Sequence, residues 1–419
     1  MLFEDLSLSK SIQRAVFEIG YLEATPIQEK SIPIILAGND LVGCAQTGTG
    51  KTGAFAIPII HHIHRIVGSS KKAKVIRTLV VTPTRELAVQ IGQSFETYAK
   101  YTNLNQLTIF GGVSQVPQVD TLKKGVDILI ATPGRLLDLH KQGFIDLDHL
   151  HTLVLDEADQ MLDMGFINDV KKIVKLTPKN RQTLLFSATM PMAIRELAET
   201  FLTKPEYVSV SPVSSTAETV EQRVYFVNKE DKRQLLYHLI KNEDISDVLV
   251  FSRTKHGADN VVKALRKQGI AAEAIHGDKS QNARQRVLDA FKSKEVGVLV
   301  ATDIAARGID IDKLPFIINF DLPNIPETYV HRIGRTGRAG NGGIAISFCS
   351  KDEEGYWKDI QKLVKVNIKT INDHPYTWKE GNPEAKPDLR NKAKFGENKA
   401  KDNNSRKSDA SKKNKKRWY

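Results

Sequence analysis

Residues 40–60 read DLVGCAQTGTGKTGAFAIPII, which places an apolar strand pattern, a glycine-rich loop and a helical pattern in direct succession. In the loop at residues 45–52, the glycines allow successive backbone N–H groups to turn toward the oxygens of a phosphate group. We expect Lys51 to reach the β- and γ-phosphates of a nucleotide, and the Thr52 hydroxyl to ligate Mg²⁺. The strict P-loop pattern has glycine at the position of Ala45. The alternative is an ordinary glycine-rich turn, which the flanking strand and helix disfavour.

The same alternation of short β-branched runs and longer helical patterns continues through the first half of the chain. Near-continuous apolar runs are typical of strands that are buried on both faces of a parallel sheet. Helical patterns such as those at 52–67 and 85–100 separate these runs, which predicts βαβ units. The strands expected in this half are 40–45, 78–83, 106–111, 127–133, 152–159 and 182–189.

A second set of strands follows the stretch at 209–222, SVSPVSSTAETVEQ, which has no clear period. We interpret this stretch as a linker. The expected parts are an N-terminal domain at 1–208, a linker at 209–221, a C-terminal domain at 222–375 and a tail at 376–419. The strands expected in the second domain are 222–227, 247–252, 271–277, 296–303, 316–321 and 343–349, with a last helix at 353–366 that closes the sheet. The pattern predicts an α/β fold with two parallel sheets.

The net charge of +12 is unevenly distributed along the chain. Residues 386–419 contain thirteen Lys or Arg and four Asp or Glu, so this segment carries +9 and the remainder is near neutral. From about Trp378 onward the sequence has no Val or Ile and cannot bury enough apolar area to fold, which predicts a disordered basic tail. Such a segment favours a polyanionic partner, nucleic acid first.

The composition also excludes several classes of protein. No stretch approaches the roughly 18–20 uninterrupted apolar residues of a membrane span. The first ten residues carry acids and lack the basic region of a signal peptide. Cys44 and Cys349 lie far apart, which argues against a disulfide framework or a cysteine-based metal site. We therefore expect no membrane partner and a cytoplasmic, reducing location.

An acidic cluster, Asp-Glu-Ala-Asp at 156–159, ends one of the expected strands. The carboxyl ends of parallel strands meet at the ligand crevice of an open α/β sheet, so we expect these acids to lie beside the P-loop. One carboxylate suits Mg²⁺, and its neighbour can orient or deprotonate an attacking water. The alternative is a solvated helix start, which the upstream P-loop disfavours.

The second half contains the motif HRIGRTGR at 331–338, in which Arg332, Arg335 and Arg338 have the spacing i, i+3, i+6. A helical turn would place the three arginines on one side. Guanidinium groups suit a γ-phosphate whose charge spreads in the transition state. The alternative is a solvated basic face, although glycines make a poor surface helix. Because this half lacks a P-loop, we expect one nucleotide between a half that binds it and a half that supplies arginines.

With these motifs in this order, residues 1–370 resemble the DEAD-box RNA helicases of superfamily 2, and look most like the bacterial RhlE-type branch. Alanine at position 45 is the usual form in this family. The stretch GYLEATPIQ at 20–28 is similar to the Q motif. The resemblance implies that Gln28 reads adenine, since an amide offers both a donor and an acceptor. It also implies that Tyr21 stacks on the base and that Phe3 supports it; core packing is the alternative for these two aromatics.

The resemblance further implies a set of ATP-site roles. Binding residues would be Phe3, Tyr21, Gln28, Gln46, Thr47, Gly48, Thr49, Gly50, Lys51, Thr52, Gly308 and Asp310. Catalytic residues would be Lys51, Asp156 as the Mg²⁺ partner, Glu157 as the general base, and Arg335 and Arg338 as arginine fingers. Coupling residues would be Asp159, Ser187, Thr189 and His331, with hydroxyls bonded to Asp159. The alternative for His331 is a satisfied core or interface histidine.

The resemblance also implies an RNA groove. Its residues would be Pro83, Thr84, Arg85, Gly111, Gly112, Thr132, Pro133, Gly134, Arg135, Gln281, Arg284 and Thr302. Glycine and threonine allow close backbone approach, so N–H groups, hydroxyls and a few arginines can grip phosphates without reading bases. RNA would be distinguished from DNA by strand shape and 2′-OH contacts. Taken singly, each of these segments is also typical of a strand-to-helix turn.

We therefore predict two tandem RecA-like α/β domains with a disordered basic C-terminal tail, and a monomeric core. The predicted function is ATP-dependent local unwinding or remodelling of short structured RNA, in which hydrolysis releases the RNA strand. One alternative is a DNA-stimulated translocase of the same superfamily, which Gln28 and the acidic motif disfavour. The other is a non-enzymatic RNA-annealing or clamping protein, which Glu157, Arg335 and Arg338 disfavour.

Overall fold

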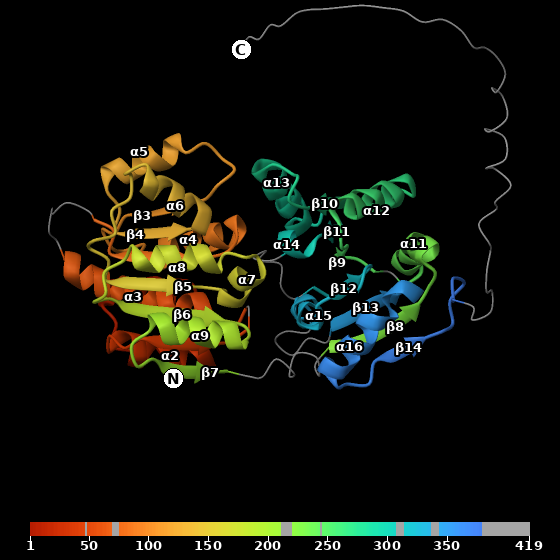
Figure 1. The fold of residues 1–419 in the computed structure, drawn as a ribbon, viewed down its shortest axis with the longest axis horizontal. Helices are drawn as coiled ribbons and strands as arrows, with labels where there is room; N and C mark the ends of the chain where they lie inside the picture. The colour runs from red at the N-terminus through yellow and green to blue at the C-terminus, as the bar shows by residue number, and fades with distance from the viewer. Residues whose placement is uncertain are drawn as a thin grey trace, which may run out of the picture. The chain divides into compact units, whose positions relative to one another are not determined.

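The structure is a computed structural model that describes residues 1–46, 48–68, 75–210, 220–243, 245–306, 314–336 and 343–378. Within these ranges the chain forms two seven-stranded sheets, and every pairing between their strands is parallel (Figure 1). The predicted α/β fold with two RecA-like parallel sheets is confirmed. Residues 379–419 of the expected tail and residues 211–219 of the expected linker lie outside the described residues. The first residues of the expected tail belong to the second domain, since Thr377 pairs with Val227 and Trp378 packs against Phe226.

The first sheet has the strand order β3-β4-β2-β5-β6-β1-β7. Its strands are β1 (Leu41–Cys44), β2 (Thr78–Val81), β3 (Gln106–Ile109), β4 (Ile128–Ala131), β5 (Thr152–Leu155), β6 (Gln182–Ser187) and β7 (Glu206–Ser209). Its helices are α1 (Lys10–Glu18), α2 (Pro26–Leu36), α3 (Lys51–Val67), α4 (Arg85–Tyr98), α5 (Val116–Lys124), α6 (Pro133–Lys141), α7 (Ala158–Asp163), α8 (Ile167–Lys175) and α9 (Met192–Phe201).

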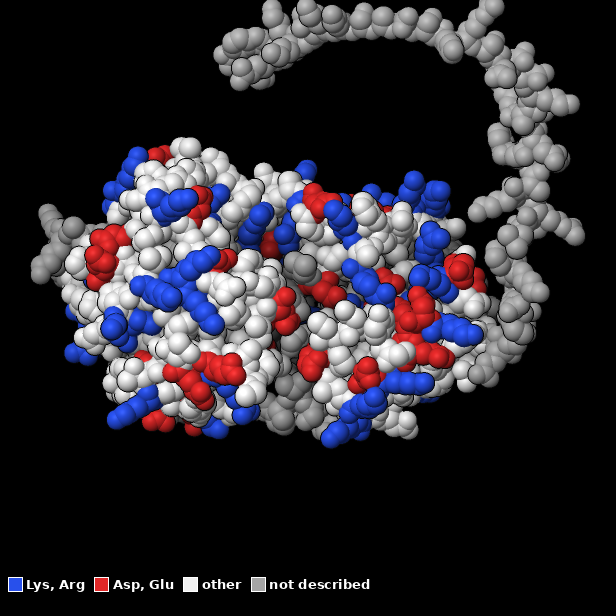
Figure 2. Space-filling view, viewed as in Figure 1, with Lys and Arg blue, Asp and Glu red and all other residues white. Residues whose placement is uncertain are grey.

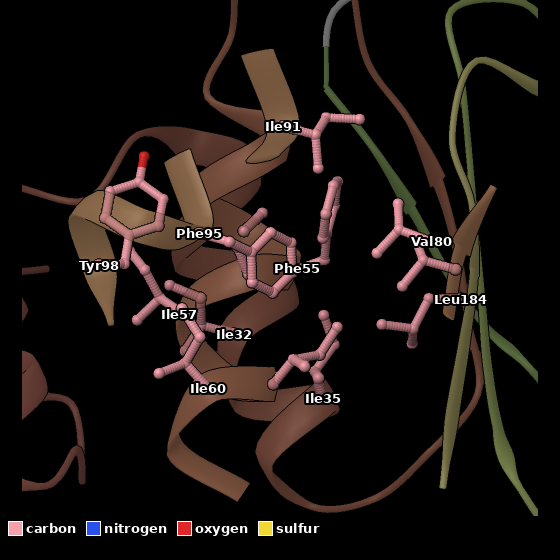
Figure 3. Close-up of a cluster of buried hydrophobic side chains, with 14 of the residues drawn as sticks. Ile32, Ile35, Phe55, Ile57, Ile60, Val80, Ile91, Phe95, Tyr98 and Leu184 are labelled. Atoms are coloured by element: carbon pink, nitrogen blue, oxygen red, sulfur yellow. The ribbon is translucent and has the colours of Figure 1, made fainter. Parts of the chain in front are cut away.

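Alternate residues of these strands belong to two separate hydrophobic clusters, one on each face of the sheet. Val80 and Leu184 pack in the cluster that includes the apolar sides of α1 to α4. In Figure 3, Phe55 of α3 and Phe95 of α4 lie between the helices and these strand residues, with ring centroids 6.2 Å apart. Neighbouring strand residues such as Leu79 pack in the cluster with α6, α8 and α9. Burial on both faces explains the unbroken apolar runs.

The second sheet has the order β10-β11-β9-β12-β13-β8-β14. Its strands are β8 (Val220–Phe226), β9 (Val248–Phe251), β10 (Ala272–Ile275), β11 (Val298–Ala301), β12 (Phe316–Asn319), β13 (Gly343–Cys349) and β14 (Lys369–Ile371). Its helices are α11 (Lys232–Asn242), α12 (Lys255–Lys267), α13 (Gln281–Lys292), α14 (Asp303–Ala306), α15 (Pro326–Ile333) and α16 (Glu354–Val364). One face packs against α11 and α12, and the other carries two clusters with α13 to α16.

The edge strands β7 and β14 are not predicted by the sequence. In β7 only Val208 is buried, while Glu206, Tyr207 and Ser209 are exposed. In β14, Lys369 and Thr370 are exposed as well. An edge strand with one partner has less of its surface covered, so these segments lack the apolar run that marks the central strands. The expected linker therefore starts on the last residue of β7.

The described ranges contain no helix with the length and apolar character that a membrane crossing requires. Figure 2 shows Lys and Arg interspersed with Asp and Glu over the visible face of the described part of the chain. This mixed surface agrees with a near-neutral charge outside the tail.

His61 on α3 joins the N-terminal segment to the helix that follows the P-loop. The Ser9 backbone N–H, just before α1, donates to His61 Nδ1 at 3.0 Å, so this nitrogen must be deprotonated. Burial lowers the pKa of His61, and the neighbouring His62 and Arg65 act in the same direction. The native state therefore binds a proton at His61 less readily than the unfolded chain does.

We predict that His61→Asn flattens the pH dependence of stability. His61 contributes fully to the free energy of unfolding above its unfolded pKa of about 6.5, and this contribution is lost as the pH falls below that value. Asparagine can accept the Ser9 hydrogen bond but does not titrate. Urea unfolding of both proteins between about pH 5 and 8 measures this difference. Parallel curves across this range would contradict the assignment.

Candidate functional site

The P-loop runs from the end of β1 to the first residue of α3, Lys51. Gly48 and Gly50 have φ values of 79° and 94°, in the left-handed region that glycine favours. A Cβ atom at Gly50 would also lie 2.7 Å from Gln28 Nε2, so the loop packs too closely there for a side chain. The Thr49 hydroxyl donates to the Gln46 carbonyl at 2.7 Å and tightens the turn. The predicted Thr47 lies outside the described residues.

The acidic motif lies against this loop, because β1 and β5 are both neighbours of β6 in the sheet. Lys51 Nζ donates to Glu157 Oε1 at 3.0 Å, and both side chains are buried. The other Glu157 oxygen accepts a hydrogen bond from Gln160 Nε2. Glu157 has a φ of 55°, so the chain turns sharply between β5 and α7. Such a backbone conformation in a non-glycine residue is typical of functional sites.

The pKa values of the adjacent carboxyls of Asp156 and Glu157 are shifted in opposite directions. Burial raises the pKa of Asp156 to about 7, although Lys51 acts in the opposite direction. Burial also opposes ionisation of Glu157, but the attraction of Lys51 outweighs it and lowers the pKa to about 2. Arg335 and His331 add to this lowering. Two neighbouring acids are thus separated in their tendency to hold a proton, as in many sites that use one acid as a base and another as a ligand.

A cleft of about 520 Å³ extends over the P-loop. Its lining includes Tyr21, Gly48, Gly50, Lys51, Thr52, Asp156, Glu157, Gln160 and, from the second domain, Arg335. Tyr21 lines one end of the cleft and packs against Phe3, which does not itself line it, with ring centroids 5.8 Å apart. The Tyr21 hydroxyl lies 3.4 Å from that of Tyr98, the last residue of α4. The cleft therefore has an aromatic end and a charged end, as a nucleotide requires.

Gln28 supports the P-loop from beneath and is 2% exposed. Its Nε2 donates to the Gly50 carbonyl at 3.1 Å, and its Oε1 accepts from the Thr25 backbone N–H at 2.9 Å. An amide has a second donor hydrogen and a second acceptor lone pair beyond these. The recognition of adenine by Gln28 stays a prediction, while its contact with the loop is direct.

The predicted coupling residues of the first domain lie together. Asp159 Oδ2 accepts hydrogen bonds from both the backbone N–H and the hydroxyl of Thr189, each at 2.9 Å. The Ser187 hydroxyl accepts from the Asp159 backbone N–H at 3.2 Å and donates to the Thr189 carbonyl at 2.7 Å. The segment that follows β6 is thereby fastened to the start of α7, two residues from Glu157.

Two of the predicted second-domain residues face this site. Arg335 is 7% exposed, and both Arg335 and His331 line a pocket with Glu157, Gln160 and Ala188. The buried His331 Nε2 has no hydrogen-bond partner among the described residues. Gly308, Asp310 and Arg338 lie outside the described residues.

Helix α15 ends at Ile333, and a turn continues to Arg335, whose backbone N–H donates to the Arg332 carbonyl at 3.2 Å. Arg332 and Arg335 line the same pocket, and the position of Arg338 on their side stays a prediction. Arg332, within the helix, is 2% exposed and pairs with both carboxylate oxygens of Asp303 at 2.6 and 2.8 Å. It therefore serves as a buried link between α14 and α15.

Most of the predicted RNA-groove residues line a second pocket, of about 460 Å³. They are Pro83, Thr84, Arg85, Gly111, Thr132, Pro133, Gly134, Arg135 and Arg284. All of them except Arg284, which lies on α13 of the second domain, follow β2, β3 and β4, whose carboxyl ends meet at one edge of the sheet. Gly112, Gln281 and Thr302 do not line this pocket. A Cβ atom at Gly112 would lie 2.2 Å from the Arg85 guanidinium, so glycine there allows Arg85 its position.

Two contributors to these sites, Gln160 and Tyr98, are missed by the sequence prediction, and the contacts of a third, Glu86 in the stretch at 83–88 expected to line the RNA groove, are not predicted. Gln160 and Tyr98 contact predicted residues of the first cleft, as described above. Glu86, which is 5% exposed, accepts from Gln281 Nε2 at 2.9 Å and pairs with Arg284 at 3.1 Å. The only local signal for Gln160 is its helical spacing of three residues from Glu157. Tyr98 and Glu86 are brought to their partners by tertiary folding.

Comparison with known proteins agrees with this geometry. The family model described as DEAD/DEAH box helicase matches residues 25–197, and that described as Helicase conserved C-terminal domain matches residues 231–340. The ATP-dependent RNA helicase CshA of Listeria monocytogenes is 43% identical over 90% of this chain and 71% of its own length. The DEAD-box ATP-dependent RNA helicase CshA of Geobacillus kaustophilus is 44% identical over 88% of this chain and 78% of its length.

Among solved structures, S. cerevisiae Dbp5 bound to RNA and ADP BeF3 has a TM-score of 0.77 and 28% sequence identity. The similarity covers 88% of this chain and 95% of that chain. Both curated relatives carry the name CshA, and the assignment to the RhlE-type branch stays a prediction. The chain belongs to the DEAD-box ATP-dependent RNA helicases.

Proposed function

We propose that this protein couples ATP hydrolysis to the local separation of short structured RNA. The observation that carries the proposal is the cleft in which Lys51 and Glu157 of the first domain meet Arg335 of the second. The ionised Glu157 can orient an attacking water and take its proton, and a guanidinium suits the charge that develops on a transferred phosphoryl group. The separate pocket with Arg85, Arg135 and Arg284 is suited to phosphates of a nucleic acid strand.

The residues present also suit Mg²⁺. The Thr52 hydroxyl and the Asp156 carboxyl line the same cleft, and oxygen donors are the ligands that Mg²⁺ prefers. Burial raises the pKa of Asp156. A divalent cation bound beside this carboxyl would favour its ionised form and so oppose that rise. In that position Mg²⁺ would neutralise charge on the β- and γ-phosphates of ATP.

The proposal includes a monomeric core in the cytoplasm. Cys44 and Cys349 are both free thiols, which agrees with a reducing compartment. Burial raises the pKa of both thiols, that of Cys349 to about 12, so neither is poised to react. Sedimentation of the purified protein, with and without a reductant, measures whether it stays monomeric.

The test compares ATP hydrolysis in the presence of RNA and of single-stranded DNA with the same sequence. We expect RNA to stimulate turnover strongly and DNA weakly, and a short RNA duplex to be separated only when ATP is hydrolysed. Equal stimulation by DNA would favour a superfamily 2 translocase. Strand annealing without turnover would favour the non-enzymatic alternative.

A further inference from the structure

The two sheets have the same topology. Counted from its own first strand, β8, the second sheet repeats the order of the first sheet. In each case the first strand lies between the sixth and the seventh, so β8 corresponds to β1 and β12 corresponds to β5. The helix after β8 therefore corresponds to the helix that follows the P-loop. Each of these helices, α3 and α11, begins with a lysine, Lys51 and Lys232 respectively.

The surroundings of Lys232 reproduce those of Lys51. Lys232 is 2% exposed and lies 3.6 Å from Asp321 Oδ1, just after β12. Lys51 is likewise buried beside the acids that follow β5. Lys232 Nζ also donates to the Phe320 carbonyl at 2.8 Å. The second domain thus retains a buried lysine beside a strand-end acid at the position where the first domain binds a nucleotide under the proposed function.

The loop before Lys232 cannot cradle a phosphate group. Residues 227–231 read Val-Asn-Lys-Glu-Asp, without glycine and with two acids, whereas the corresponding loop at 45–50 contains two glycines. Backbone N–H groups turned toward an anion require the conformations that glycine allows.

A carboxylate of the chain occupies the centre of this cluster. Glu353, before α16, is 2% exposed. Its Oε2 accepts from Lys232 Nζ at 2.6 Å and from the Ser350 backbone N–H at 3.2 Å. The Ser350 hydroxyl lies 2.9 Å from the same oxygen and 2.6 Å from Asp352 Oδ1, so the two carboxylates share this donor. Its Oε1 accepts from Arg253 Nη2 at 2.6 Å and from the Leu322 backbone N–H at 3.2 Å.

These five donors are two cations, two backbone N–H groups and one hydroxyl, which is the donor set of a phosphate site. We propose that the second domain has an oxyanion site beside the lysine that corresponds to Lys51, built from residues that follow β9, β12 and β13, and that the Glu353 carboxylate occupies it permanently in place of a phosphate group. The ligand class of the site is a small tetrahedral oxyanion. The native protein excludes such an ion, because the Glu353 carboxylate already occupies the site.

The test is to remove the carboxylate and supply phosphate. Glu353→Ala in the full chain leaves Lys232 and Arg253 without their shared anion, and it frees a space similar in size to phosphate. Thermal unfolding is followed in rising sodium phosphate at constant ionic strength, with ADP present throughout so that the first P-loop is equally occupied. We expect a lowered Tm that rises with the logarithm of phosphate concentration, while the Tm of wild type stays flat.

Calorimetric titration of phosphate into the same samples gives the affinity directly. We expect binding to be about tenfold or more tighter in Glu353→Ala than in wild type, since charge-assisted hydrogen bonds to an oxyanion are strong. Asp359→Ala is the matched control, because Asp359 is an exposed acid of α16 that pairs with Lys362 at the surface. It should show no response to phosphate. The double variant Lys232→Met/Glu353→Ala should lose most of the response.

If Glu353→Ala is recovered unfolded, its refolding in sodium phosphate and in sodium chloride of equal ionic strength provides the same comparison. A phosphate-dependent rise in the Tm of Glu353→Ala, or a phosphate-dependent recovery of folded protein, supports the proposal. Loss of stability without any phosphate response overturns it, and so does an equal response in wild type. Because the readout is stability and phosphate affinity, a failure here is distinguishable from a failure of the proposed ATPase activity.

Discussion

Replacing Arg335 with alanine should lower kcat for RNA-stimulated ATP hydrolysis by roughly 10³-fold or more, the loss that is typical of an arginine finger. ATP affinity should change far less, because Lys51 and the P-loop belong to the first domain. Arg335 is buried in the cleft beside Glu157, where its charge is little screened by solvent. Steady-state turnover with RNA, together with binding of a fluorescent ATP analogue, separates the two quantities.

Two further variants make the Arg335 experiment specific. Arg335→Lys retains the charge but not the planar fork, so we expect it to recover only part of the turnover. Arg233→Ala removes an exposed arginine from α11 and should leave kcat unchanged. A raised KM with an unchanged kcat in Arg335→Ala would identify Arg335 as a ground-state contact instead.

Glu157→Gln should lower kcat by roughly 10²- to 10⁴-fold, the range attributed to general acid–base catalysis. The change removes a carboxylate whose pKa is lowered to about 2 and replaces it with an amide of the same shape. ATP and RNA should still bind, and RNA should dissociate more slowly, since hydrolysis is the step that releases it. Single-turnover hydrolysis and RNA dissociation rates measure both effects.

The variant also removes the carboxylate that pairs with the buried Lys51, so its folding must be checked independently. Circular dichroism and thermal unfolding provide this control, and Glu199→Gln on the exposed side of α9 is the matched variant. Full ATP turnover with an ordinary RNA dissociation rate would show that Glu157 is not the base.

The parts of the fold that were predictable are those with local signals. Residues 40–60 contain β1, the glycine-rich loop and the first part of α3. Each of these three elements is indicated by the residues within it. The central strands are buried on both faces and therefore appear as apolar runs. β7 and β14 were missed because an edge strand needs fewer apolar residues, as the exposed Tyr207 and Lys369 illustrate.

The parts of the candidate site that lie at strand ends could also be predicted from the sequence. The P-loop and the acidic motif lie at strand ends, and the carboxyl ends of parallel strands converge, so their proximity follows from topology. The pairing of Arg332 with Asp303 did not follow, because it depends on how α14 and α15 pack against each other. The approach of Tyr98 to Tyr21, and of Glu86 to Arg284, depends on the packing of whole helices, which no short stretch of sequence specifies.

The position of β1 in its sheet has a consequence for synthesis of the protein. β1 pairs with β6 and β7, which are the last two strands of the first sheet along the chain. The strand that leads into the P-loop therefore leaves the ribosome long before either of its neighbours. It must stay unpaired while β2 to β5 are made, and the acids after β5 acquire their lysine partner only once β6 has emerged. The nucleotide site, although encoded near the start of the chain, is among the last parts of its domain to form.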